Sequence, residues 1–414
     1  MKLSIFARMT LSISLAVFLM TSVASTSSGM IDSDLKLPEK EWVDGTYMRN
    51  WKTKTMDSYP SSSINSGLSD AYPPENMNLT VSDFGLNIDY NQTFRWVMTG
   101  EHCYIYVAYD LAAPYYNYYD ASNDQYVFVN PNYPTGAWST EDRISTAQLK
   151  YLMDEFDNSI YPKMTSIFGF PNERPAGETK IYILIMNIRD ESYYDSTIEW
   201  YVAGYFSWGE DAVANKNMIH IDSFDWTNRI GPDVARPYVY ESTFTHEFEH
   251  LIHNDIDAGE ESWVDEGLAD LASYFCGYGH ETGHIAYYLV YHPFVSLTFF
   301  GGGLENYGAS YLFQLYLYEK FGGQKFIVDL VHNQLHGIEG IEDTLKAHGY
   351  MISFEQIFQN WAIANYIDDL SFGDGEYGYL TLDIPSKDTL GYSIEYALHN
   401  YWPVSYTHLR AHET

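Results

Sequence analysis

The nine residues from Thr245 to His253, Thr-His-Glu-Phe-Glu-His-Leu-Ile-His, constrain this chain more than any other stretch. On a helix, His246 and His250 lie about 40° apart around the axis, so both imidazoles can reach a single ion. Glu247 lies between them, and its carboxylate can reach a water on that ion rather than the ion itself. Such a short pattern also occurs by chance, so the flanking sequence has to decide whether it has a chemical role.

His-Glu-x-x-His is the arrangement found in zinc hydrolases, whose ion has three protein ligands and one position open for water. The third ligand has to come from beyond His250. In metzincins it is the sixth residue after the second histidine, with a glycine midway, but Ile256 and His253 hold these positions here. Glu266 is the better candidate, because the 16 residues from His250 allow a loop and a return along an antiparallel second helix.

Asp270 follows Glu266 by one helical turn and lies on the same face. Its carboxylate could accept the outer N–H of a zinc-bound histidine, which fixes the tautomer of the ring and raises its basicity. A solvated acidic helix face would produce the same pair, but both motifs together are far more restrictive than either alone. The sequence therefore predicts a zinc site of His246, His250 and Glu266, supported by Asp270. We interpret His253 as a residue that supports this site or packs beside it.

These motifs together carry a family resemblance. His246–His250, followed by Trp263–Asp270 (Trp-Val-Asp-Glu-Gly-Leu-Ala-Asp), resembles the gluzincins, the thermolysin-like branch of zinc peptidases. Within that branch the chain is similar to the secreted hyicolysin-like group, often called immune-inhibitor-A-like, and the run Tyr307–Gly323 is also similar to that group. The likeness covers roughly residues 104–369. Compared with thermolysin itself, the spacing from the second histidine to the glutamate is shorter, and Asp265 replaces the usual asparagine.

The resemblance implies a zinc-dependent peptidase, and the mechanism follows from the ligands. Zinc lowers the pKa of its water toward ~7 and polarises the scissile carbonyl. Glu247 then takes the proton of the water and passes it to the leaving amine. The oxyanion needs a second donor, for which Tyr307 is our candidate and Tyr311, His284 and His292 are rivals. Because the chain has 39 tyrosines, packing is the alternative role of each tyrosine.

Strand-like segments dominate ahead of the motif, and helices dominate behind it. We therefore expect an α+β fold of the zincin-like type, in which a mixed, sheet-bearing N-terminal subdomain carries the motif helix and a mainly helical C-terminal subdomain follows. The clearest expected strands cover residues 104–109, 180–186 and 217–222. The expected helices cover residues 146–158, 242–254, 263–274, 308–320 and 354–366.

Residues 1–24 fit an export signal peptide, because Lys2 and Arg8 precede an apolar run and small residues end at Ala24. We therefore expect a secreted protein, extracellular or at the cell surface. Residues 403–414 resemble a translated sequencing adaptor, and the natural chain is expected to continue beyond Trp402. The expected divisions are a linker or pro-segment-like region at 25–93, a strand-rich upper part of the peptidase domain at 94–240, a zinc-binding helical part at 241–370 and the start of a truncated C-terminal region at 371–402.

The net charge of −34 disfavours nucleic acid and anionic membranes as partners. The apolar stretch 285–300 contains His292, Pro293 and several tyrosines, which favours burial in the protein over insertion in a membrane. Cys103 and Cys276 are too few for a disulfide framework or a thiolate metal site. They could pair or stay free, and the place of Cys276 in an expected core helix favours buried free thiols.

Two further motifs only partly match known functional patterns. Asp190–Asp195 (Asp-Glu-Ser-Tyr-Tyr-Asp) could bind Ca²⁺ in a structural role, but it lacks the EF-hand spacing and glycine, which favours a solvated acidic loop. Gly303–Asn306 resembles a Gly-x-Met-Glu-Asn exopeptidase motif. That motif belongs before the zinc helix, whereas this stretch follows it, so we interpret it as a loop.

The leading hypothesis is a secreted zinc metalloendopeptidase that acts on protein or peptide substrates. Two alternatives are a zinc hydrolase of a non-standard peptide substrate and a surface adhesin built on a peptidase fold. The presence of Glu247 argues against the adhesin, because a binding module has no need of a general base. The sequence predicts neither the cleavage preference nor the oligomeric state.

Overall fold

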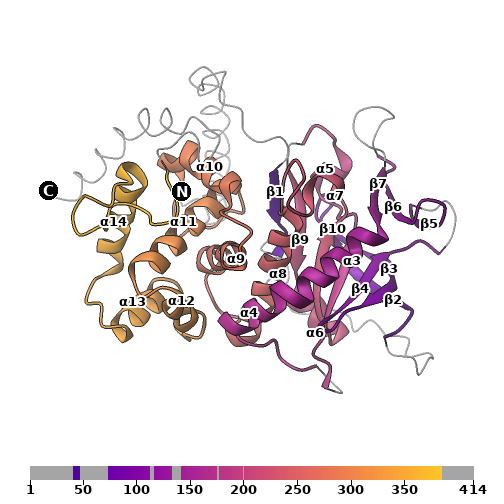
Figure 1. Ribbon diagram of the computed structural model, residues 1–414, viewed down its shortest axis with the longest axis horizontal. Helices are drawn as coiled ribbons and strands as arrows, with labels where there is room; N and C mark the ends of the chain where they lie inside the picture. Colours follow the sequence, from indigo (N-terminus) through magenta and orange to yellow (C-terminus); the bar gives the residue numbers. More distant parts are fainter. Residues whose placement is uncertain are drawn as a thin grey trace, which may run out of the picture.

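A mixed sheet of seven strands forms one part of the fold, and a group of helices forms the other (Figure 1). The computed structural model describes residues 41–46, 73–111, 116–132, 141–174, 177–198 and 200–384. The predicted signal peptide and the segment 403–414 lie outside these ranges. The strands follow one another across the sheet in the order β1 (Glu41–Asp44), β9 (Trp200–Phe206), β10 (Asn217–Asp222), β8 (Ile181–Met186), β4 (Cys103–Ala108), β3 (Ile88–Thr99) and β2 (Asn76–Asp83).

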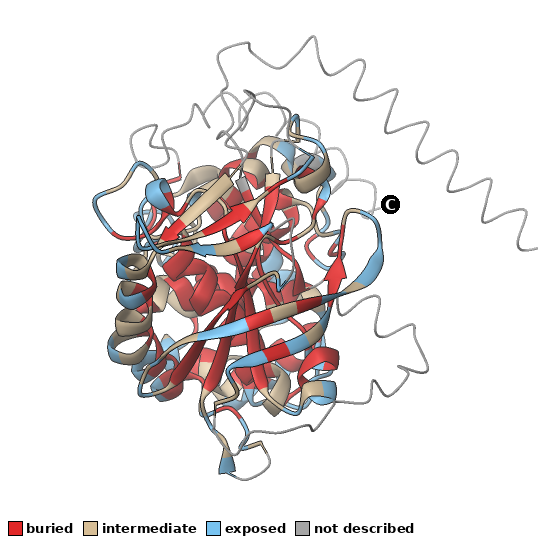
Figure 2. Ribbon diagram, turned by 90° about the vertical axis from the view of Figure 1, so that its right-hand side faces the viewer, coloured by how far each residue is buried: buried red, intermediate tan, exposed pale blue. Residues whose placement is uncertain are grey.

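The centre of the sheet is parallel and fully buried. β10, β8 and β4 run parallel to one another, and every residue of these strands is buried. Continuous apolar runs such as Ile-Tyr-Ile-Leu-Ile-Met in β8 are typical of strands covered on both faces. The three predicted strands are thereby confirmed. The antiparallel pair β2–β3 carries many exposed residues, and Figure 2 shows the buried residues concentrated in the central strands.

A second, smaller sheet lies in the order β5 (Asn117–Asp120), β6 (Gln125–Val129) and β7 (Glu141–Ser145). After β7, Ser145 and Gln148 form a capping box that starts α3 (Thr146–Glu155). The helical path continues through a π-helical turn, Phe156–Ile160, into α4 (Tyr161–Ile167). The predicted helix at 146–158 is confirmed, and the chain stays helical beyond its expected end. Three further short helices are α5 (Glu191–Tyr194), α6 (Trp208–Ala214) and α7 (Trp226–Arg229).

The motif helix α8 (Val239–Ile256) connects the sheet to the helical part. It packs against β9 and β10 on one side and against the next helix, α9, on the other. The predicted start at Ser242 is wrong by one turn, because Tyr238 in the left-handed region (φ 63°) precedes the helix. The helices that follow α8 are α9 (Ser262–Cys276), α10 (Thr282–Tyr291), the 3₁₀ turn His292–Phe294, α11 (Leu304–Lys320), α12 (Gln324–Val331), α13 (Gly337–Ala347) and α14 (Phe354–Ile367).

Two glycines allow α11 to approach its neighbours closely. A Cβ at Gly308 in α11 would lie 2.0 Å from the carbonyl oxygen of His284 in α10. A Cβ at Gly267 in α9 would lie 2.6 Å from the carbonyl oxygen of Ser310. Larger residues at these positions would force α9, α10 and α11 apart, so the glycines determine how these three helices pack.

The N-terminal region predicted as a linker or pro-segment contributes to the sheet. Residues 41–44 form β1 and pair in parallel with β9, and residues 76–83 form β2. The upper part that was expected to begin at residue 94 includes β3 from Ile88 onward. Whether part of this region is removed from the mature protein, and where the divisions at 240, 370 and 402 fall, stay predictions.

Two sequence interpretations need correction. Gly303–Asn306 is not a loop, because α11 begins at Leu304 and the Asn306 side chain accepts the N–H groups of Gly301 and Gly303. The acidic stretch Asp190–Asp195 is solvated only in part: Glu191 and Asp195 are exposed, but Asp190 is buried, and its two oxygens accept the N–H groups of Tyr193 (2.8 Å) and Val202 (2.7 Å). Asp190 therefore caps α5 and ties it to β9.

Other expectations are confirmed. Cys103 and Cys276 are buried free thiols. The expected burial of the apolar stretch 285–300 is confirmed only in part: Ile285 and Leu289 in α10 are buried, whereas Phe294 and Phe299 in the turns after it are exposed. Among the helices of the described ranges, none combines the length and the apolar character that a membrane-spanning helix requires.

Candidate metal centre

Helix α8 places the two histidines of the motif side by side in the interior. Their Nε2 atoms lie 3.1 Å apart, and both side chains are almost fully buried. The helix can carry charged residues inward because its partners are also polar there: α9 supplies carboxylates on the facing side, and Gly204 of β9 leaves room beside the motif glutamate. Buried polar residues of this density need partners or an ion.

Glu266 of α9 completes a triangle with the two histidines. Its Oε2 atom lies 3.3 Å from Nε2 of His246 and 3.3 Å from Nε2 of His250. Tetrahedral zinc with bonds of ~2.0–2.1 Å separates its ligand atoms by about 3.3 Å. The three predicted ligands therefore stand at the separations that one zinc ion would impose, and the donor set of two imidazoles and a carboxylate suits that ion.

Asp44 is a fourth donor that sequence reasoning missed. Its Oδ2 atom lies 3.8 Å from Nε2 of His250 and 4.0 Å from Nε2 of His246, and its carboxylate groups with Glu266 and both histidines as a possible metal-binding set. The Asp44 side chain is fully buried, and Oδ2 has no hydrogen-bond partner in the described chain. These separations exceed those among the other three donors, so Asp44 is the outermost of the four.

The outer nitrogens of both imidazoles face carboxylates. His246 Nδ1 lies 2.9 Å from Asp270 Oδ1, and His250 Nδ1 lies 3.3 Å from Asp265 Oδ2. Burial lowers the pKa of His246, but the hydrogen bonds to Asp270 and Glu266 outweigh it and hold that pKa well above its usual range. Both rings are thereby oriented so that Nε2 of each points into the donor triangle.

A second group of acidic residues lies on the outer side of His250. Glu249 and Asp265 approach His250 through Nδ1, and Asp265 also lies 3.0 Å from Nδ1 of His253. If Nε2 of His250 binds an ion, Nδ1 carries the proton and faces the Asp265 carboxylate at 3.3 Å. This cluster then orients His250 and does not form a separate metal site, and His253 packs behind it as the sequence suggested.

Glu247 lies beside the donor triangle. Its Oε2 atom accepts a hydrogen bond from Thr46 Oγ1 at 2.9 Å, and its carboxylate also faces that of Asp44. Burial raises the pKa of Glu247, and the neighbouring Asp44 carboxylate raises it further. A carboxylate with a raised pKa is suited to accept and hold a proton.

Tyr307 is the oxyanion candidate that the fold brings to this cluster. Its ring centroid lies 6.4 Å from that of His246, and its hydroxyl donates to the carbonyl oxygen of Asp44 at 3.2 Å. The rivals have other partners: Tyr311 bonds to Nδ1 of His280, and His292 to the carbonyl oxygen of Leu289. His284 bonds to Asp270 at 2.8 Å and so supports the site from behind.

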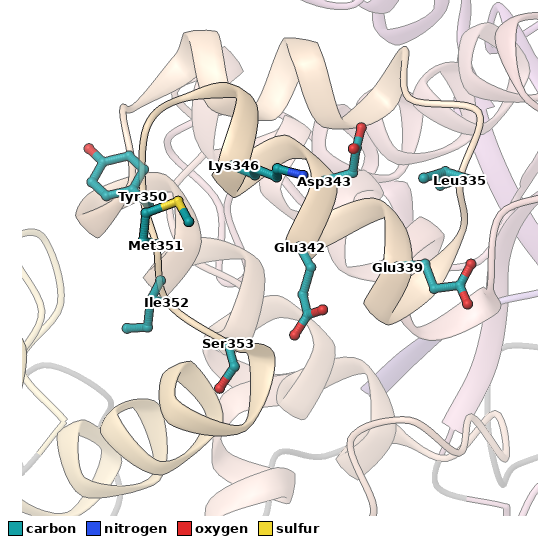
Figure 3. Close-up of a pocket in the computed structure, with 9 residues that line it drawn as sticks. All are labelled: Leu335, Glu339, Glu342, Asp343, Lys346, Tyr350, Met351, Ile352 and Ser353. Atoms are coloured by element: carbon teal, nitrogen blue, oxygen red, sulfur yellow. The ribbon is translucent and has the colours of Figure 1, made fainter.

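The described part of the chain also forms cavities at its surface. One of about 530 Å³ lies between α13 and the start of α14, where Figure 3 shows Glu342 and Lys346 on the helix and Met351 on the following turn. It contains none of the predicted site residues. A second, of about 330 Å³, is lined by Trp42, Ser242 and Glu281 and borders the donor cluster through Trp42, whose ring contacts His246.

Sequence reasoning missed Asp44, Thr46 and Asp265. Asp265 was visible only as a departure from the thermolysin pattern. Asp44 and Thr46 stand about two hundred residues before the motif, in a region of low periodicity, and no local pattern links them to it. The parallel pairing of β1 with β9 brings them to the site.

Comparison with known proteins points to metalloproteases. No protein-family profile matches the chain. The chain is 26% identical over 233 residues to the neutral metalloprotease ShpI of Staphylococcus hyicus, an alignment that covers 52% of this chain and 52% of that protein. The chain thus spans about half the length of this relative. The likeness supports a relationship to metalloproteases, and the cluster of His246, His250, Glu266 and Asp44 is a candidate site for the metal that this relationship implies.

Proposed function

We propose that this chain is a zinc metalloendopeptidase of the gluzincin type, with a zincin-like fold. The observation that carries the proposal is the donor triangle: His246, His250 and Glu266 present three donor atoms 3.1–3.3 Å apart, with Glu247 beside them. The likeness to a neutral metalloprotease points to the same chemistry.

The roles follow from the positions of the side chains. A zinc ion bound by the three ligands supplies a Lewis acid that acidifies water and polarises a carbonyl group. Glu247 accepts the proton of the attacking water and returns it to the leaving amine, for which its buried carboxylate is suited. The Tyr307 hydroxyl donates a hydrogen bond to the developing oxyanion. Asp270 orients the His246 ring.

The substrates we propose are proteins or peptides met outside the cell. The export-signal pattern of residues 1–24 supports this location, and the acidic composition is compatible with it. Nothing in the structure favours a calcium role for Asp190, since both of its oxygens accept backbone N–H groups.

The test is proteolysis of casein by the full chain and by the same protein after limited trypsin digestion, with and without EDTA. Glu247→Gln should retain one zinc per chain but lose activity ~10³-fold, because the water keeps its place and loses its base. Glu101→Gln, at a carboxylate whose side chain is 81% exposed, is the matched control. A zinc-loaded protein that cleaves neither casein nor a peptide library in either form would instead favour an adhesin or a hydrolase of modified peptides.

A further inference from the structure

We propose that residues 42–46 form an inhibitory segment of this chain, in which Asp44 takes the fourth metal position that a substrate water would need. The inference rests on the proposed function, since it concerns the same site. It is carried by three contacts, one to each group that the peptidase reaction requires.

The first contact is that of Asp44 with the metal donors. Its Oδ2 atom points into the cluster, 3.8 Å and 4.0 Å from the two Nε2 atoms, whereas Oδ1 accepts the N–H of Thr46 at 2.8 Å. The Asp44 carboxylate also faces the carboxylates of Glu247 and Glu266, and such a buried group of acids is costly unless a cation or a shared proton compensates it. A zinc ion held by His246, His250 and Glu266 provides that cation, and Asp44 would then close its coordination shell.

The second and third contacts engage the general base and the oxyanion donor. Thr46 Oγ1 donates to Glu247 Oε2 at 2.9 Å and accepts the N–H of Phe206 at 2.7 Å, so the hydroxyl is fixed between β9 and the base. The hydroxyl of Tyr307 donates to the carbonyl oxygen of Asp44. The metal donors, the base and the oxyanion donor are therefore all contacted by two residues of one short segment, Asp44 and Thr46.

The segment also covers the edge of the sheet. β1 is the terminal strand and pairs in parallel with β9, and the N–H of Gly45 extends the pairing to the carbonyl oxygen of Gly204 at 2.8 Å. Without β1, β9 would present an open edge next to the metal, where an extended peptide can add as a strand. Trp42 anchors the segment, with its ring 4.8 Å from that of His284.

Release of the segment requires one cut in a defined interval. β2 begins at Asn76 and is part of the sheet, so hydrolysis of one peptide bond between Thr46 and Asn76 would free β1 and leave the other strands in place. The step consumes one water and forms a new carboxyl and a new amino terminus. A second copy of the enzyme or another peptidase can perform it.

A rival explanation is that Asp44 is a permanent fourth ligand of a closed, structural zinc site. The two explanations differ in whether the fourth position opens. The full chain can be loaded with Co²⁺, whose visible absorption reports on the ligands, and titrated with acetohydroxamic acid as a probe for an open position. The same titration is made on Asp44→Ala, on Thr46→Val and on the control Glu101→Ala.

We expect the intact wild type and Glu101→Ala to resist the probe and Asp44→Ala to bind it at least ~10-fold more tightly, because an intramolecular competitor has been removed. Thr46→Val should show a smaller gain. Wild type cut between residues 46 and 76 and separated from the N-terminal peptide should bind the probe as tightly as Asp44→Ala. If Asp44→Ala does not fold, the affinity of the cut protein tests the proposal. Equal affinity in intact wild type, Asp44→Ala and cut protein would overturn the proposal.

Failure of this inference can be separated from failure of the proposed function. If Asp44→Ala and the cut protein gain affinity for the probe but neither cleaves casein, Asp44 does occupy the metal position and the peptidase assignment is wrong. If the intact chain, shown by mass spectrometry to retain residues 41–46, cleaves casein as fast as the cut protein, the inhibitory segment is overturned and the peptidase stands.

Discussion

Asp270 Oδ1 lies 2.9 Å from Nδ1 of His246, in the interior between α8 and α9. The other oxygen of Asp270 lies 2.8 Å from Nδ1 of His284 in α10, so one carboxylate connects the candidate metal centre to a third helix. Burial raises the pKa of Asp270, but the two histidines outweigh it and hold that pKa below its usual range, so the carboxylate stays charged.

Asp270→Asn should therefore weaken zinc binding by ~10–100-fold. Asparagine retains one oxygen for His246 but offers an N–H₂ group where His284 needs an acceptor, and it removes the negative charge that raises ligand basicity. Competition with a chromophoric chelator measures the affinity, and Asp374→Asn, at an exposed position, is the control. Unchanged affinity in Asp270→Asn would mean that the carboxylate only packs.

Tyr307→Phe tests the oxyanion donor. The substitution removes a hydroxyl whose partner is the Asp44 carbonyl oxygen, and it leaves the buried ring in place. In protein freed of residues 41–46, kcat should fall ~10²-fold or more with little change in KM, because the bond forms in the transition state. An equal loss in Tyr311→Phe, whose hydroxyl bonds to His280, would assign the effect to packing instead.

Gly204→Ala should damage the base without removing the ligands. An alanine Cβ would lie 2.7 Å from Cγ2 of Thr243, 2.9 Å from the carbonyl oxygen of His220 and 3.0 Å from Oε1 of Glu247, so β9 and these neighbours, the Glu247 carboxylate included, have to shift apart. We expect a loss of ~1–3 kcal/mol in the free energy of unfolding, a strong loss of activity and full zinc content. Urea unfolding and metal analysis measure these. Loss of zinc together with activity would show that the whole site, rather than Glu247, is displaced.

The sequence predicted the parts of this site that lie on one or two helices, because helical geometry converts spacing into direction. His246, His250, Glu266 and Asp270 needed only two helices that face each other. Asp44 could not be found this way, because its place depends on a strand pairing across about 160 residues, from β1 to β9.

Local sequence patterns also decided which helices and strands could be predicted. The strand β8 is a continuous apolar run of six residues, whereas β9, Trp-Tyr-Val-Ala-Gly-Tyr-Phe, mixes aromatic and small residues and was missed. α10, α12 and α13 were missed as well, and the start of α11 was taken for a loop, because glycines stand at or near its first turn. At Gly308 the absent side chain allows close contact with α10, so this glycine does not indicate a loop.

Gly308→Ala separates these two roles. Helix propensity alone favours alanine over glycine by about 1 kcal/mol, so a glycine without a packing role would give a more stable variant. Because the Cβ would meet the His284 carbonyl oxygen at 2.0 Å, we expect the free energy of unfolding to fall by ~2 kcal/mol or more. Gly301→Ala, whose Cβ meets nothing closer than 3.2 Å, should be nearly neutral in the same urea titration. A stabilised Gly308→Ala would contradict the close packing.

Asp368, at the end of α14, should make stability depend on pH. Its oxygens accept the N–H groups of Tyr379 and Ile384, and burial raises its pKa from 3.8 to about 6. At pH values below 3.8 the carboxyl group is protonated in both the folded and the unfolded protein. Between 3.8 and about 6 unfolding releases a proton, so rising pH favours the unfolded state, and the contribution of Asp368 is lost as the pH passes through about 6.

Asp368→Asn removes this titration and keeps a residue that tolerates the left-handed conformation found there (φ 39°). The stability of the wild type relative to the variant should therefore be greatest below pH ~4, decrease from there to pH ~6–7 and then stay constant. Urea unfolding of both proteins across this range measures the difference, and the many other carboxylates cancel because both proteins share them. Parallel pH profiles would show that Asp368 titrates at its ordinary pKa in the folded protein, because the N–H groups of Tyr379 and Ile384 then compensate for its burial.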